Sequence, residues 1–185
     1  LPETAAKLAE AVRRQEEELF TPVVSERRLS EQQQIRRVKL KRLIDAGIDP
    51  YPVDVPRTLD MADVKENSGT VSVVGRVVRV RDHGGVLFAN LREGGAERQI
   101  MFTADRRDAG LDLWRKTVDP GDVVSITGTT CLSRSGELSI HVGSWKMAAK
   151  CLTPPPDKHR GLRDAEARVR QRHMDLALSP DARRR

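Results

Sequence analysis

The run Val71–Phe102 constrains the fold more than any other part of the sequence, because apolar and polar residues alternate along it between two glycine turns. The turns are Asp82-His83-Gly84-Gly85 and Glu93-Gly94-Gly95. Alternation with a period of two is typical of half-buried strands, and glycine pairs mark tight turns. The run therefore predicts three successive β-strands.

Each of these strands can be divided into two faces, because successive side chains point to opposite sides. On the second strand the aliphatic face consists of Leu87, Ala89 and Leu91. The opposite face consists of Phe88, Asn90 and Arg92. Aromatic residues make up only 3% of the chain, so an aromatic ring on the polar face needs an explanation. We expect the aliphatic face to form the core and the other face to carry the function.

The same division applies to two later segments. In the third strand, Gln99 lies on the face opposite to Ile100 and Phe102. Further along, Glu137 alternates with the apolar residues Leu138, Ile140 and Val142. We therefore expect Gln99 and Glu137 to lie outside the core, as Phe88 does.

Five strands are predicted in all. In the first, over 71–82, the apolar residues switch from odd to even positions around Gly75, which indicates a bulge or sharp bend there. A helix over 104–118, with Leu111 and Trp114 facing inward, precedes a fourth strand over 122–132 and a fifth that starts at 137–141 and continues through Trp145. Three strands, a helix and two strands is the order of the oligonucleotide/oligosaccharide-binding (OB) barrel. We expect a mainly β fold with flanking helices: a five-stranded OB-fold β-barrel with a helix between strands 3 and 4 and N-terminal helices.

The chain divides into four predicted segments. They are a helical linker or junction to a preceding domain (1–29), an N-terminal helix with a GIDPYP connector (30–66), the barrel (67–153), and a proline linker followed by a basic helix (154–185). Helices are expected over 1–20, from Ser30 to Gly47, briefly near 59–65, and over 163–177. Because the sequence lacks an initiator methionine, we expect it to be part of a longer protein.

The charge balance favours a polyanionic partner, since the net charge is +6 and the isoelectric point is about 9.7. A basic soluble domain without such a partner is an equally good interpretation of the charge alone. The candidates for phosphate contacts are Arg36, Arg37 and Lys39 in the helix after Ser30, and Arg79 in the first strand. A run of basic residues on a helix is also typical of a plain solvated face.

The sequence offers no sign of catalysis or of a metal site. There are two cysteines, Cys131 and Cys151, without a CxxC motif, and the four histidines lack ligand spacing. No apolar run approaches the roughly 18 residues needed to span a bilayer. Phosphate-cradling loops and nucleophile motifs are missing as well. We therefore expect no catalytic residues, metal or cofactor in this chain, and binding is the better interpretation.

Single-stranded nucleic acid is bound by a stacking platform, hydrogen-bonding groups and surrounding positive charge. Phe88 offers the platform, Gln99 and Glu137 offer groups that can read a base edge, and Arg81 adds a planar cationic fork. An exposed phenylalanine on a sheet can instead cover a neighbouring helix, and the pattern alone leaves this alternative open.

Several separate motifs occur in an order that resembles bacterial class II lysyl-tRNA synthetases. They are GIDPYP (47–52), Arg57-Thr58, VGRV (74–77), SGELS (135–139), AAKCLTPPP (148–156), KHRGL (158–162) and RVRQRHMDL (168–176). The resemblance covers residues 30–185 and implies an N-terminal anticodon-binding barrel. In that family the middle anticodon uridine stacks on a phenylalanine that matches Phe88. A glutamine, an arginine and a glutamate of the same site match Gln99, Arg81 and Glu137.

The resemblance also implies properties of a parent protein, in which residues 154–185 start the link to a catalytic domain that is absent from this sequence. Such a parent is a homodimeric class II lysine–tRNA ligase of the cytoplasm that uses ATP and magnesium, and its partner is the anticodon stem-loop of lysine tRNA. Residues 1–29 fit poorly as the start of a free-standing synthetase and are similar to the junction in fusions with a lysylphosphatidylglycerol synthetase, whose membrane association comes from a separate fused domain. Two alternatives stay open: a sequence-tolerant single-strand-binding barrel, and an interaction module that docks a membrane-linked lysyltransferase.

Overall fold

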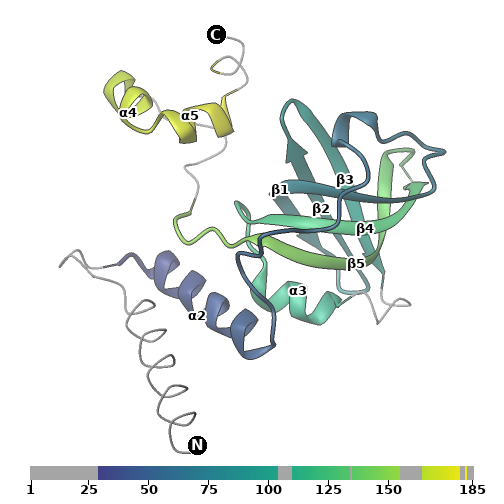
Figure 1. The fold of residues 1–185 in the computed structure, drawn as a ribbon, viewed down its shortest axis with the longest axis horizontal. Coiled ribbons are helices and arrows are strands. Elements are labelled where there is room, and N and C mark those ends of the chain that lie inside the picture. The colour runs from purple at the N-terminus through teal and green to yellow at the C-terminus, as the bar shows by residue number, and fades with distance from the viewer. Residues whose placement is uncertain (1–28, 104–109, 134, 155–163, 180–181, 183–185) are drawn as a thin grey trace, which may run out of the picture. The chain divides into compact units, whose positions relative to one another are not determined.

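The computed structural model describes residues 29–103, 110–133, 135–154, 164–179 and 182 (Figure 1). The chain divides into two units, Leu1–Ser30 and Glu31–Arg185, and the fold described here is that of the second. The helix expected over 1–20 lies outside the described residues.

Five strands form a closed barrel in the order β1-β2-β3-β5-β4 (Figure 1). Their bounds are β1 Thr70–Asp82, β2 Val86–Glu93, β3 Ala96–Thr103, β4 Val123–Leu132 and β5 Leu138–Ala149. The pairing is antiparallel except for a short parallel ladder between β3 and β5. The prediction of a mainly β fold with a five-stranded OB-fold barrel and flanking helices is confirmed. The fifth strand is longer than predicted and ends at Ala149.

The barrel interior is filled by the aliphatic faces identified in the sequence. Leu87, Ala89, Leu91, Ile100, Phe102, Ile140 and Val142 are all at most 1% exposed. The helix between β3 and β4 is α3, Leu111–Thr117, so it begins later than the predicted residue 104; residues 104–109 lie outside the described part. Leu111 and Trp114 face inward as predicted, and the Trp114 ring packs 4.9 Å from the Phe102 ring, centroid to centroid.

The bulge predicted around Gly75 in β1 exists and lies a few residues further along the strand. The pairing of β1 with β2 shifts register between Val77 and Arg79. Gly75 has a different purpose: a Cβ there would lie 2.7 Å from Met61 Cε and 3.0 Å from Leu91 Cβ. The glycine thus allows close packing, and the parity change begins three residues later.

Helix α2 spans Glu31–Asp45 and ends as the sequence predicted. Gly47 has a φ of +73°, and its amide donates to the Ile44 carbonyl at 2.9 Å. The Ile48 amide donates to the Leu43 carbonyl, also at 2.9 Å. These two bonds form a Schellman motif, in which glycine adopts the left-handed conformation without steric cost.

The remaining helices are shorter than predicted. The piece expected near 59–65 is a single 3-10 turn, η1, Met61–Asp63. The helix expected over 163–177 is two helices, α4 Ala165–Arg170 and α5 Arg172–Leu178, because Gln171 between them leaves the helical conformation with φ −111° and ψ 48°. Within the described ranges, no helix has the length and apolar character needed to cross a membrane.

Candidate nucleic-acid interface

Strand register arranges the outer side chains of β1, β2, β3 and β5 in two parallel rows. We call the first the ring row; it consists of Arg81, Phe88, Met101 and His141. We call the second the amide row; it consists of Arg79, Asn90, Gln99 and Ser139. Each row takes one residue from each strand in turn, and the two rows are two residues apart along every strand. The two rows therefore share the outer surface of the barrel, where Gln99 and Ser139 are covered and the other members are at least partly exposed.

Phe88 lies in the middle of this surface and keeps part of its ring exposed. Its cross-strand neighbour is Arg81, and Gln99 is its diagonal neighbour on β3. Diagonal residues on one sheet face have Cβ atoms about 7–8 Å apart, within reach of a base stacked on the ring. The His83 ring lies beside Phe88, with the centroids 6.3 Å apart and the ring planes at 67°.

Gln99 and Glu137, both predicted to read a base edge, bind each other. The Gln99 amide nitrogen donates to Glu137 Oε2 at 2.8 Å, and the Ser139 hydroxyl donates to Gln99 Oε1 at 2.9 Å. Gln99 is only 4% exposed, whereas Glu137 is exposed. The carboxylate is thus the group that faces solvent, and the amide behind it fixes its orientation.

Arg79 and Arg81 provide the positive charge of the surface. Both follow the β1 bulge and are exposed. Neither forms an ion pair with any of the residues that the structure describes. A guanidinium without an internal partner can donate several hydrogen bonds to phosphate or base oxygens.

The three helix candidates for phosphate contacts differ in their surroundings. Arg36 is 7% exposed and donates to the Cys151 carbonyl at 2.8 Å and to the Pro120 carbonyl at 2.7 Å. Lys39 Nζ lies 2.5 Å from Asp119 Oδ1. These two cations are held by internal partners. Arg37 is partly exposed and has no ion pair with the described residues, so its phosphate contact stays a prediction, as does that of Arg79.

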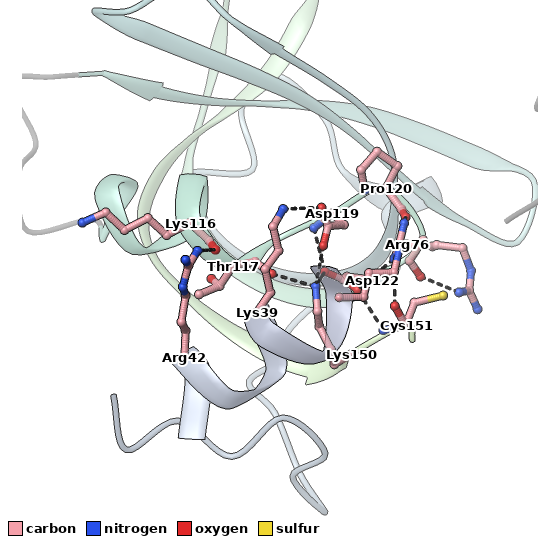
Figure 2. Close-up of polar contacts among 12 residues, drawn as sticks. Lys39, Arg42, Arg76, Lys116, Thr117, Asp119, Pro120, Asp122, Lys150 and Cys151 are labelled. Carbon is pink, nitrogen blue, oxygen red and sulfur yellow. Dashed lines mark hydrogen bonds and ion pairs between the residues drawn. The ribbon is translucent and has the colours of Figure 1, made fainter. Parts of the chain in front are cut away.

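A buried polar cluster under α2 was not found from the sequence (Figure 2). At its centre, Lys150 is 3% exposed, and its ammonium donates to the Thr117 carbonyl at 2.7 Å, to Asp119 Oδ2 at 2.9 Å and to Asp122 Oδ2 at 2.7 Å. Burial raises the pKa of Asp119, but hydrogen bonds from Lys39 and Lys150 outweigh it, and the pKa lies below its ordinary value. This cluster fixes α2 to the barrel.

His141 is a second residue that the sequence reasoning missed, although a signal was present. It lies between the buried Ile140 and Val142, so the same alternation that places Glu137 outside the core also predicts an outward position for His141. Its Nε2 lies 2.6 Å from the Thr103 hydroxyl. Among the described residues, no group of three or more His, Cys, Asp or Glu side chains could hold a metal ion.

Comparison with known proteins agrees with this fold. Residues 71–148 match the tRNA_anti-codon family model, described as an OB-fold nucleic acid binding domain. The matched range contains the ring row, the amide row and Glu137. The barrel therefore has both the architecture and the sequence pattern of an OB-fold nucleic-acid-binding domain.

The chain is also similar to segments of longer proteins. The chain is 46% identical over 159 residues to the lysylphosphatidylglycerol biosynthesis bifunctional protein LysX of Mycolicibacterium vanbaalenii. It is 43% identical over 159 residues to LysX of Nocardia farcinica and 42% identical over 161 residues to LysX of Mycobacterium tuberculosis. The alignments cover 84–85% of this chain but only 14% of each of these relatives.

Proposed function

We propose that the barrel binds the anticodon loop of lysine tRNA, with the middle uridine stacked on Phe88. The observation that carries this proposal is the arrangement around the ring: a partly exposed Phe88 flanked by Arg81 and diagonal to an amide that orients an exposed carboxylate. Stacking on an aromatic side chain contributes about 1–3 kcal/mol per base. The match of residues 71–148 to an anticodon-binding family supports RNA as the ligand.

The exposed carboxylate explains how uridine would be preferred. Uracil presents its N3–H donor between two carbonyl acceptors, and the Glu137 carboxylate can only accept. Cytosine has an acceptor at N3, so it would place two acceptors opposite each other. Arg81 can donate to a uracil carbonyl. In this proposal Gln99 acts through Glu137 as a positioning residue, because its amide is buried behind the carboxylate.

The role of the whole protein is a further part of the proposal. The relatives are named for lysylphosphatidylglycerol biosynthesis and as bifunctional, and this chain spans about one seventh of their length. We infer that the chain is the tRNA-recognition part of a larger, homodimeric protein. A class II domain outside this chain would attach lysine to tRNA with ATP and magnesium. That protein is cytoplasmic, or membrane-associated through a further domain.

The test compares two anticodon stem-loop RNAs, one with the anticodon UUU and one with UCU, at a single salt concentration. We expect the protein to bind the UUU loop about 10- to 100-fold more tightly, because a hydrogen bond to a charged group contributes about 1.5–3 kcal/mol. Phe88→Ala should weaken binding of both RNAs. Glu137→Gln should reduce the ratio between them.

A matched control separates base reading from net charge. Asp45→Asn also removes one negative charge, but from an exposed position near the end of α2, so it should change both affinities equally. Equal binding of the two RNAs by the wild-type protein would refute base recognition and favour a sequence-tolerant single-strand-binding barrel. Absence of RNA binding together with self-association in light scattering would favour an interaction module.

A further inference from the structure

The turn between β1 and β2 is tied to α3 by a two-pronged ion pair. Arg115 Nε donates to Asp82 Oδ2 at 2.7 Å, and Arg115 Nη2 donates to Asp82 Oδ1 at 2.9 Å. The same Nη2 also donates to the Gly84 carbonyl. A guanidinium that binds both oxygens of a carboxylate fixes direction as well as distance. The Arg115 guanidinium therefore binds the turn at two places, the Asp82 side chain and the Gly84 backbone carbonyl.

The Asp82 carboxylate that Arg115 binds also accepts a hydrogen bond from within the turn. Asp82 Oδ1 accepts a hydrogen bond from the Gly84 amide at 3.0 Å, and Gly84 has a φ of +76°. The His83 amide donates to the Val86 carbonyl at 3.0 Å. The residue between Asp82 and Gly84 is His83, so its position depends on a turn that is fixed at both neighbours.

His83 is exposed and stands beside the stacking ring. Its imidazole is 6.3 Å from the Phe88 ring, centroid to centroid, and is turned by 67° from its plane. A base lying flat against Phe88 would meet this second ring at its side. The two rings, one on a strand and one on a fixed turn, form a corner that offers a nucleobase one ring below it and one ring beside it.

We propose that His83 forms the side wall of the base site and that Arg115 is the positioning residue that holds this wall in place. The inference rests on the proposed function, since it assumes that a base stacks on Phe88. Arg115 has little charge left to offer a phosphate, because Asp82 binds it at 2.7 Å and Asp112 lies 3.8 Å away. Its effect on RNA therefore passes through the turn. A wall that is fixed before binding avoids the cost of ordering a loop on the ligand.

The first test measures binding of the UUU anticodon stem-loop to three variants: His83→Ala, Arg115→Ala and the double variant. His83→Ala should weaken binding about three- to tenfold, the range that aromatic contacts give. Arg115→Ala should weaken it by a similar factor. The double variant should bind no more weakly than the worse single variant, because both changes remove the same wall.

Two controls separate positioning from charge and from unfolding. Lys116→Ala removes an exposed cation from the same helix without touching the turn, and it should leave the affinity within twofold of wild type if charge is unimportant here. Arg115→Lys keeps the charge but lacks the fork, so it should behave like Arg115→Ala while the circular dichroism spectrum stays that of the wild type.

A spectroscopic readout tests the wall without RNA. The imidazole proton signals of His83 lie in the field of the Phe88 ring, so Phe88→Leu should shift them. Arg115→Lys should shift the same signals in the same direction, which a purely structural role elsewhere in α3 would not produce. Unchanged His83 signals in Arg115→Lys would overturn the positioning role.

The binding data distinguish two kinds of failure. If Phe88→Ala leaves the affinity unchanged, the proposed function fails and the wall has no base to contact. If Phe88→Ala weakens binding but His83→Ala has no effect, the base site stands and this inference is overturned. Fully additive losses in the double variant would also overturn it, because Arg115 would then act on RNA independently of His83.

Discussion

Replacing Lys150 by methionine tests how much the buried polar cluster contributes to the stability of the fold. The ammonium of Lys150 makes its three hydrogen bonds in a place where neither its own side chain nor that of Asp122 has any exposed surface. Methionine keeps most of the aliphatic stem and removes the charge. The change removes the closer of the two cations beside the buried Asp122 carboxylate, so that only the Arg36 guanidinium remains, 3.9 Å from Oδ1. It also leaves the Thr117 carbonyl without that donor.

The expected loss follows from the bonds that remain. Breaking a buried ion pair by removing one partner costs about 3–5 kcal/mol. Asp122 still accepts from the Cys151 amide at 2.8 Å and from the Asp119 amide at 2.7 Å. These bonds continue to stabilise the carboxylate, so we expect the lower end of the range, about 3 kcal/mol.

Urea denaturation followed by tryptophan fluorescence measures this loss, because Trp114 is buried and packs against Trp145. Lys41→Met is the matched control: Lys41 pairs with Asp45 at the surface, and its removal should cost less than about 0.5 kcal/mol. The double variant Lys150→Met/Asp122→Asn should lose less than the sum of its single variants. If Lys150→Met loses no more than Lys41→Met, the argument from the buried charge is refuted.

Three further outcomes are expected. Gly128→Ala should destabilise the barrel by about 1–3 kcal/mol in the same urea assay, because a Cβ there would lie 2.3 Å from the His141 carbonyl oxygen; a variant as stable as wild type would contradict this. Asp119 has a lowered pKa, so its contribution to stability is fully present above the ordinary value of about 3.9 and is lost as the pH falls through the lower folded value. Urea midpoints between pH 7 and pH 2 should therefore decline less steeply at the acid end in Asp119→Asn than in wild type, and parallel curves would contradict this. Ser139→Ala removes the hydroxyl that donates to Gln99, and it should reduce the ratio of UUU to UCU affinity while the protein stays folded; an unchanged ratio would show that the amide needs no such support.

The strands were predictable from the sequence because their signal is local. Alternation places Leu87 and Ile100 inside and Phe88 outside whatever the rest of the chain does, and the structure agrees. The same alternation puts Gln99 on the outer face. It could not show that Glu137, 38 residues away, would cover the amide, since that contact exists only after β5 pairs with β3.

The buried cluster could not be predicted because its members look like surface residues. Charged side chains are almost never fully buried unless they are paired. Lys150 and Asp122 are 28 residues apart in the sequence and meet only when the end of β5 returns to the start of β4. Arg36 and Lys39 were assigned to solvent or phosphate for the same reason. A basic helix gives no local sign of which cations find internal carboxylates and carbonyls.

The β1 bulge explains how a single strand can both close the barrel and contribute to the proposed recognition surface. Before the bulge, residues 70–76 of β1 pair with β4 and close the barrel. After it, residues 79–82 pair with β2 and carry Arg79 and Arg81, which form no ion pair with the residues that the structure describes. At the change of partner, the Val77 amide donates to the Asp122 carbonyl at 2.8 Å, which joins the strand to the buried cluster. An extra residue at this point turns Arg79 and Arg81 to the outer face without disturbing the alternation that fills the core. The register shift is thus the feature that lets one strand both seal the barrel and present charge beside Phe88.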